Sequence, residues 1–123
     1  MIATLILMYL AGLAEAIMDI LNHRFSSSIF KDFNEHWWNP EVSWKNKWKD
    51  YDHTKGEAFI GSSTVFVFIT DAWHFFKFLK NTFICGAIIS PLDLDLWGFI
   101  LAFVIIKVVW RVSFECHYRF FKN

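Results

Sequence analysis

The chain has 123 residues, which is enough for one domain, and its formal net charge is zero. Hydrophobic residues make up 55% of it, including 15 Phe and 7 Trp. A soluble fold of this length has too little interior to bury so many large apolar side chains, so we expect a membrane protein. The balanced charge gives no indication of nucleic-acid binding.

The first apolar segment, residues 2–22, is long enough to cross a hydrocarbon core of about 30 Å at about 1.5 Å per residue. It lacks the basic residues that open a secretory signal, although Ala14, Glu15 and Ala16 resemble a signal cleavage site. We therefore expect a retained transmembrane helix, with a cleaved signal as the alternative.

Residues 23–57 connect the first and second apolar segments and are too aromatic for a flexible linker. Trp44 and Trp48 are four residues apart, so a helical turn would place both on one face, with lysines around them. Tryptophan interleaved with lysine is typical of a membrane–water interface. We expect interfacial anchoring, with a protein-recognition surface as the alternative, and the anchoring residues are Trp37, Trp38, Trp44 and Trp48.

Two further apolar segments complete the chain, at residues 63–90 and 94–116. The start of the second lies anywhere from Ala58 to Val65. Pro91, Asp93 and Asp95 between them favour a tight turn and the N-terminus of a following helix. The predicted fold is an all-α integral membrane protein, with three transmembrane helices in a single membrane domain, residues 1–123. A fourth crossing would need a break at 77–81, where no Gly or Pro signals a turn.

The distribution of Lys and Arg predicts the orientation. The 23–57 connection is rich in basic residues, and Arg119 and Lys122 follow the third segment, whereas the short connection at 91–95 carries only acids. Three crossings place the long connection and the C-terminus on one side of the membrane. By the excess of basic residues on cytoplasmic loops, that side is cytoplasmic and the N-terminus is outside.

Polar residues fall on single faces of all three predicted helices. On the second, a stripe within about 140° contains Asp71, His74 and Lys77, whereas Lys80 lies almost opposite Asp71. Intramembrane ionisable groups are costly alone, so we expect mutual pairing, with the carboxylates facing Lys107, Arg111 and Lys77. The predicted polar cluster is Glu15, Asp19, Asp71, His74, Lys107 and Arg111.

This cluster leaves several functions open. The first is a small membrane subunit or homo-oligomer in which the charges orient helices, with no assigned activity. The second is a membrane-embedded metal-dependent enzyme, because i,i+3 and i,i+4 spacings suit carboxylate and histidine ligands for Mn, Fe or Mg. Its ligand set is Glu15, Asp19, Asp71 and His74. Proton or ion conduction, and a phage-type lytic membrane protein, are further alternatives.

Other chemistry has little support in the sequence. Cys85 and Cys116 lie in separate apolar stretches without CxxC spacing, so we expect two buried thiols. Phosphate-loop, GxSxG and HExxH patterns do not occur. No resemblance to a characterised family is evident, and no catalytic residue is assigned.

Overall fold

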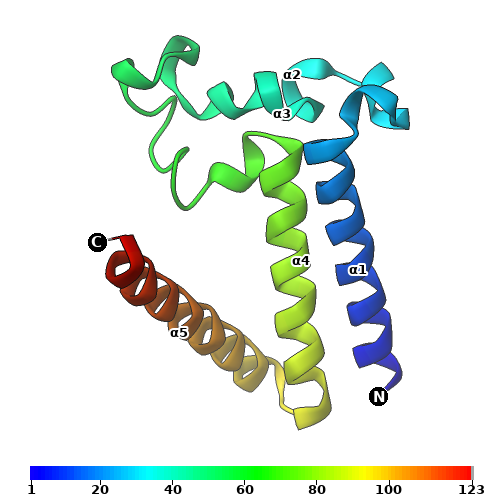
Figure 1. Cartoon of the computed structure of the whole chain (residues 1–123). Coiled ribbons are helices and arrows are strands. Elements are labelled where there is room, and N and C mark those ends of the chain that lie inside the picture. Colours follow the sequence, from blue (N-terminus) through cyan, green and yellow to red (C-terminus); the bar gives the residue numbers. More distant parts are fainter. Residues whose placement is uncertain (123) are drawn as a thin grey trace. The chain divides into compact units, whose positions relative to one another are not determined.

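The computed structural model describes residues 1–122, with the backbone alone for Lys122, so the predicted role of that lysine lies outside the described side chains. Three long helices dominate this part of the chain: α1 (Ile2–His23), α4 (Ala72–Ile89) and α5 (Leu96–Lys122) (Figure 1). Two helices of one turn, α2 (Glu35–Trp38) and α3 (Pro40–Ser43), lie between α1 and α4.

Three segments are long and apolar enough to cross a membrane: Ile2–His23, Ala72–Leu92 and Leu96–Phe121. The prediction of an all-α fold with three such helices is therefore confirmed for the described residues. The second helix, however, begins at Ala72 and not at residue 63, and the third continues beyond residue 116. An apolar run alone does not specify a helix, and residues 63–71 form turns and the short 3-10 helix Val67–Ile69 before α4 begins.

The chain divides into two compact units, Met1–Tyr9 with the chain from Thr82 onward, and Leu10–Asn81. In the first unit, the Thr4 and Ser90 hydroxyls share a hydrogen bond of 2.7 Å. A Cβ on Gly86 would lie 3.3 Å from Leu7 Cδ1, so this glycine allows close helix packing. Pro91 and the left-handed Asp93 then turn the chain, and Asp95 Oδ1 accepts the Gly98 amide at 2.8 Å as α5 begins.

Helix α5 differs from the other two because none of its described residues is buried. Most of its large apolar side chains are exposed, among them Trp110, Phe120 and Phe121. Cys116 is also exposed, whereas Cys85 on α4 is buried, so the expectation of two buried thiols is wrong for Cys116. The i,i+3 and i,i+4 periodicity of apolar residues is incomplete around Cys116, where Glu115 and His117 flank it.

The second unit packs the C-terminal part of α1 against the start of α4, with the two running antiparallel (Figure 1). Its core consists of Leu21, Phe30 and Ala72, which are 2%, 9% and 0% exposed. Phe30 stacks on Trp38 with ring centroids 4.9 Å apart, and Trp38 in turn lies 5.9 Å from Phe76 of α4. The aromatic connection is therefore folded onto the ends of the two long helices.

Side-chain caps begin the short turns of this connection. Ser28 accepts the Phe30 amide, Asn34 the His36 amide, and Asn39 the Glu41 amide. Pro40 follows Asn39 at the first position of α3, where its missing N–H costs nothing. Ser, Asn and Pro thus account for a chain of short turns where a single amphipathic helix would have needed uninterrupted helix formers.

Asn46 ties the connection to the start of α4. Its Nδ2 donates to the carbonyl oxygens of His36, at 2.6 Å, and Thr70, at 2.8 Å. The first bond spans 10 positions in the sequence and the second spans 24, so Asn46 holds the backbone at His36 and the backbone at Thr70 together. A half-buried amide that uses both donors in this way fixes the relative positions of the two backbone segments.

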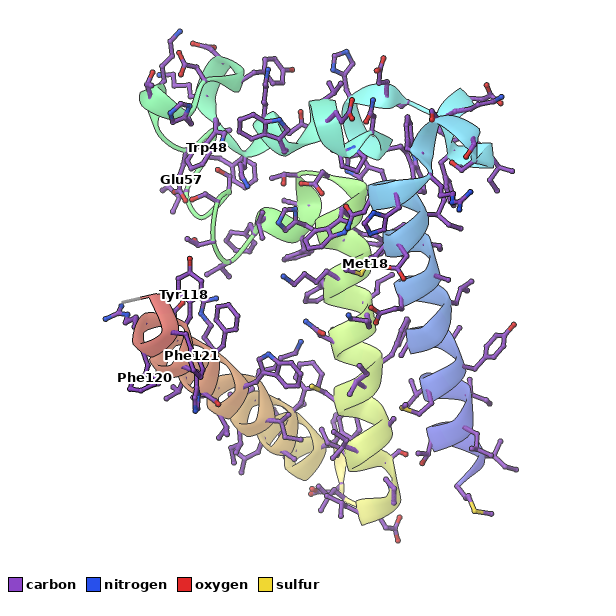
Figure 2. The ribbon with its side chains drawn as sticks, in the orientation of Figure 1. Met18, Trp48, Glu57, Tyr118, Phe120 and Phe121 are labelled. Atoms are coloured by element: carbon purple, nitrogen blue, oxygen red, sulfur yellow. The ribbon has the colours of Figure 1, made fainter. Side chains whose placement is uncertain are left out.

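Residues 47–63 form a loop closed by an isolated bridge between Trp48 and Glu57, both of which are labelled in Figure 2. Gly56 and Gly61 have φ of 84° and 81°, a conformation that favours glycine. Ser62 is fully buried and its hydroxyl donates to the Lys47 carbonyl at 2.7 Å. Phe68 then stacks on Phe78 of α4 at 4.4 Å, so the apolar run before α4 folds back along that helix.

The Glu57 carboxylate holds the end of this loop. It accepts the backbone amides of Gly61, at 3.0 Å, and Ser63, at 3.2 Å, together with the Ser63 hydroxyl. These hydrogen bonds favour the ionised form, and the bond from the Ser63 side chain is the strongest cause of a lowered Glu57 pKa. The stabilisation is therefore present above the ordinary value of 4.5 and is lost as pH falls through the lowered pKa.

We expect the amide proton shifts of Gly61 and Ser63 to titrate together below pH 4.5, because protonation of Glu57 removes their acceptor. In Glu57→Gln this titration should disappear. NMR of the protein in nanodiscs checks both outcomes. Asp52→Asn is the matched control, because Asp52 accepts the Thr54 amide at 2.9 Å and should affect that amide alone. Amides of Gly61 and Ser63 that ignore pH in the unsubstituted protein would contradict the assignment.

Candidate functional site

Asp71 occupies the N-cap position of α4 and is only 2% exposed. Its Oδ1 accepts the backbone amide of His74 at 2.9 Å, which satisfies one of the free N–H groups of the first turn. Its Oδ2 lies 2.7 Å from His74 Nδ1 and 3.3 Å from the Thr70 hydroxyl. The Thr70 hydroxyl donates to the Val67 carbonyl at 2.7 Å, so it contributes little to the carboxylate.

The two oxygens of Asp71 therefore perform different tasks, one starting the helix and the other orienting an imidazole. His74 Nδ1 donates to the carboxylate in the neutral ring, which leaves Nε2 as the hydrogen-bond acceptor. The His74 ring also packs edge-on against Trp73, with centroids 5.0 Å apart, and its side chain is 24% exposed. The imidazole is held in one orientation and is still reachable from outside.

A cleft of about 220 Å³ lies beside this pair. It is formed where the C-terminal end of α1, the helix α3 and the first turn of α4 meet, all within the second unit. Trp44 is exposed at its edge, and the indole N–H of Trp73 is buried without a hydrogen-bond partner among the described residues. The lining residues are Asn22, Pro40, Ser43, Trp44, Asp71, Trp73 and His74.

Glu15 forms an ion pair with Lys80, the base that lies outside the predicted polar stripe of the second helix. Its Oε2 lies 2.8 Å from the Lys80 ammonium, whereas the sequence predicted pairing with Lys107, Arg111 or Lys77. Lys77 instead lies over the Trp73 ring, 5.0 Å from its centroid. The reason is that Lys80 is a long side chain, which can reach a neighbouring helix from a position off the polar stripe.

Lys107 and Arg111 belong to the other compact unit. The Arg111 guanidinium lies 2.6 Å from Glu115 one turn along α5, and Arg119 is 3.8 Å from the same carboxylate. Lys107 lies over the Phe103 ring at 5.5 Å. The partner of Arg111 is thus Glu115, four residues along the same helix, and this i,i+4 spacing can be read from the sequence.

The predicted metal ligands Glu15, Asp19, Asp71 and His74 are not gathered around one point. Asp71 and His74 are in contact, but Glu15 pairs with Lys80, and Asp19 lies in a separate hollow near the end of α1. Within residues 1–122, no group of three or more His, Cys, Asp or Glu side chains is placed to hold a metal ion. A ligand set for Mn, Fe or Mg is therefore not formed by the described residues.

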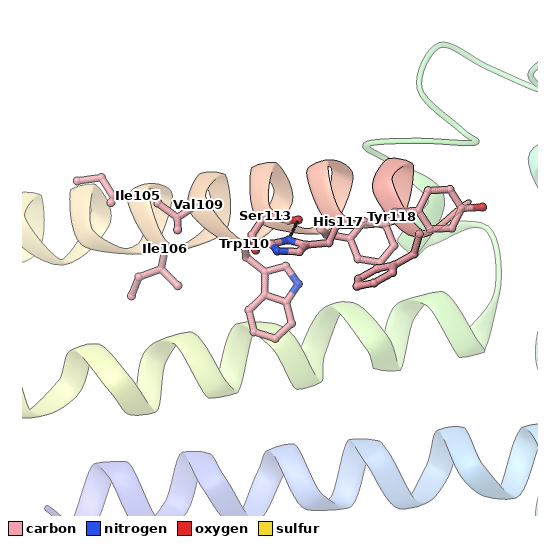
Figure 3. Close-up of a pocket in the computed structure, with 9 residues that line it drawn as sticks. Ile105, Ile106, Val109, Trp110, Ser113, His117 and Tyr118 are labelled. Carbon is pink, nitrogen blue, oxygen red and sulfur yellow. Dashed lines mark hydrogen bonds between the residues drawn. The ribbon is translucent and has the colours of Figure 1, made fainter. Parts of the chain in front are cut away.

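A hollow of about 840 Å³ lies along the exposed face of α5 (Figure 3). The polar contact among its lining residues joins two residues one helical turn apart: His117 Nδ1 lies 2.7 Å from the Ser113 carbonyl oxygen. All of its walls come from one helix, so it is a surface and not an enclosed site. The lining residues are Ile105, Ile106, Val109, Trp110, Ser113, Phe114, His117, Tyr118 and Phe121.

Sequence reasoning found Asp71 and His74 but missed Asn22 and Ser43, which share their cleft. Asn22 carries a local signal, because it lies on the same helical face as Glu15 and Asp19, whereas Ser43 reaches the cleft only when the connection folds back over α1. No family model, curated protein or solved structure matches the chain at a significant level. The function must therefore be inferred from the chemistry of the side chains.

Asp71→Asn tests the orientation of the imidazole. Asparagine remains a good N-cap, but its single oxygen is then used by the His74 amide, so its NH₂ group faces Nδ1 and favours the Nε2–H tautomer. We expect ¹⁵N NMR of histidine to show the Nδ1–H tautomer of neutral His74 and the reverse in the variant. Asp71→Ala should also lower stability by about 0.5–2 kcal/mol through loss of the cap. Identical tautomers in both proteins would contradict this role of Asp71.

Proposed function

We propose that the protein is an integral membrane protein with three crossings, its N-terminus outside and residues 23–57 and the C-terminus in the cytoplasm. The three apolar helices support the crossings, and the basic residues of the connection and tail support the orientation. In this arrangement the cleft lies at the cytoplasmic membrane–water boundary, because it is built from the end of α1 and the start of α4.

We propose that the protein acts through an acid–base site in this cleft, where His74 receives a proton or a hydrogen bond from a small polar ligand. The observation that supports this most directly is the 2.7 Å contact between His74 Nδ1 and the buried Asp71 carboxylate. A carboxylate behind an imidazole fixes its tautomer and stabilises the cation that forms when Nε2 takes a proton.

The rest of the cleft suits a ligand with both a donor and an acceptor. His74 Nε2 offers an acceptor, and the exposed Asn22 carries an amide NH₂ group that can donate to a ligand oxygen. A volume of about 220 Å³ is smaller than most drug-sized pockets, so the group that enters is small, or is one end of a larger molecule. We assign proton exchange and ligand binding to this cleft, and we assign no nucleophile.

Diethyl pyrocarbonate, which acylates unprotonated imidazole nitrogens, tests whether His74 Nε2 is available in the cleft. We expect His74 to be modified, and Asp71→Asn to slow the reaction several-fold, because the tautomer change removes the lone pair from Nε2. Peptide mass spectrometry reads the rate, and His53 in the exposed loop serves as the internal control. If His53 reacts and His74 does not, the site is closed and the proposal fails.

A second candidate function is assembly, as a membrane subunit or homo-oligomer, and α5 favours it. None of its described residues is buried, although Lys107 and Arg111 lie within the span. A charged side chain near the bilayer centre costs about 2.5–3.5 kcal/mol by insertion measurements. Although Glu115 lies beside Arg111 and Phe103 beside Lys107, a partner helix that shields this face from lipid would stabilise α5 further. Proton or ion conduction and membrane lysis also need assembly, because three helices enclose little lumen.

Cys116 provides a direct test of this assembly, because it is exposed on α5 while Cys85 is buried. We expect a short bis-maleimide to link two copies of the protein in liposomes, and Cys116→Ser to abolish the product. Gel electrophoresis shows the linked species. A strictly monomeric protein in nanodiscs, with no linked product at any reagent concentration, would remove the homo-oligomer from consideration.

A further inference from the structure

A second polar hollow, of about 540 Å³, lies at the C-terminal end of α1, and Asp71 and His74 are not among its lining residues. The helix ends here because the Arg24 amide makes the last α-helical bond, to the Ile20 carbonyl at 2.8 Å, and a short turn follows. Five of its six residues are polar or charged. The lining residues are Asp19, Ile20, His23, Arg24, Ser27 and Ser28.

Arg24 is the strongest hydrogen-bond donor in this hollow, and no described residue pairs with its guanidinium. It is exposed, and no carboxylate within the described residues lies within 4.0 Å of it. His23 beside it is exposed as well. A planar fork of N–H donors without a carboxylate is suited to an anion with several oxygens, which for arginine means a carboxylate or a phosphate.

The serines of the hollow differ in how freely they can add to such a site. Ser28 is occupied, because its hydroxyl donates to the Phe25 carbonyl at 2.8 Å and accepts the Phe30 amide at 3.2 Å. Ser27 is exposed and makes a single longer bond, to the Arg24 carbonyl at 3.2 Å. Its hydroxyl can turn to a ligand at little cost, whereas Ser28 is required to cap the following turn.

The surroundings of the hollow indicate where the anion comes from. Helix α1 is one of the three apolar spans, so its last residues lie where the hydrocarbon ends. Ile20 on the membrane side is 36% exposed, and Ile29 beyond the hollow is 74% exposed. An arginine at the end of a span, bordered by exposed apolar side chains, has the arrangement needed to hold a headgroup while acyl chains lie along the helix.

We propose that this hollow binds the phosphate of a membrane phospholipid, with Arg24 as the main contact and His23 and Ser27 as supporting donors. Asp19 lies five residues deeper on α1, about 7.5 Å at about 1.5 Å per residue, so it is level with the lipid backbone and not with the phosphate. A carboxylate in that position repels a second negative group. A single guanidinium provides one site for phosphate oxygens, so the ligand is a lipid with one phosphodiester, such as phosphatidylglycerol.

Native mass spectrometry of the full chain, delipidated in detergent and titrated with phosphatidylglycerol, tests the proposal. We expect one lipid to bind with preference, and Arg24→Gln to weaken it about tenfold or more, as expected for loss of a charge-assisted hydrogen bond. Lys49→Gln, which removes an exposed cation from the same connection, is the control and should change binding little. Arg24→Lys should retain part of the affinity, because it keeps the charge but not the fork.

Two further ligands separate a lipid site from other anion sites. Diacylglycerol with the same acyl chains lacks the phosphate and should bind no better to the unsubstituted protein than to Arg24→Gln. Inorganic phosphate lacks the chains and should not displace the lipid at equal concentration. Equal losses in Arg24→Gln and Lys49→Gln, equal binding of diacylglycerol, or displacement by inorganic phosphate would each overturn the proposal. Unchanged tryptophan fluorescence in Arg24→Gln shows that the fold is retained.

Discussion

The carboxylate of Asp71 is the contact on which the rest of the structure depends, because it decides where α4 begins. A helix that began at residue 63 would carry Asp71 and His74 well inside an apolar span, where an ion pair must compensate for the loss of water. With the cap at Asp71, helix formation starts one residue later, at Ala72. The acid and the histidine are then at the end of the helix, and the same carboxylate that satisfies the first turn orients the imidazole.

This boundary gives the aromatic connection its structural role. Trp37 and Trp38 were predicted as interfacial anchors, and both are partly buried, packed against the core formed by Leu21, Phe30 and Ala72. Trp44 remains exposed and borders the cleft. The tryptophans thus hold the connection over the helix ends, and the connection in turn supplies Pro40, Ser43 and Trp44 to the cleft. Stacked rings and two bonds from Asn46 do this without a long helix or a sheet.

The sequence predicted the features that depend on local pattern. Apolar length identified three long helices, and the i,i+3 spacing of Asp71 and His74 correctly predicted that they lie on one side of a helical turn. What it could not predict depends on how distant segments meet. The partner of Glu15 is Lys80, a contact set by the register of α1 against α4, and no periodicity within either helix specifies that register. The start of α4 was placed too early because Val65, Val67 and Ile69 are equally compatible with a helix and with an apolar segment folded back through Phe68.

The central claim is that the membrane boundary lies at the start of α4, so that the Asp71–His74 site is interfacial and not intramembrane. Spin-label accessibility in nanodiscs measures this directly, with labels at Glu41→Cys, beside the cleft, and Ile105→Cys in a Cys116→Ser background. Both native side chains are exposed, so burial does not decide the result. We expect a water-soluble nickel reagent to relax the label at 41 and oxygen to dominate at 105. An oxygen-dominated, nickel-protected label at 41 would place α3 and the cleft in the bilayer and contradict the interfacial site.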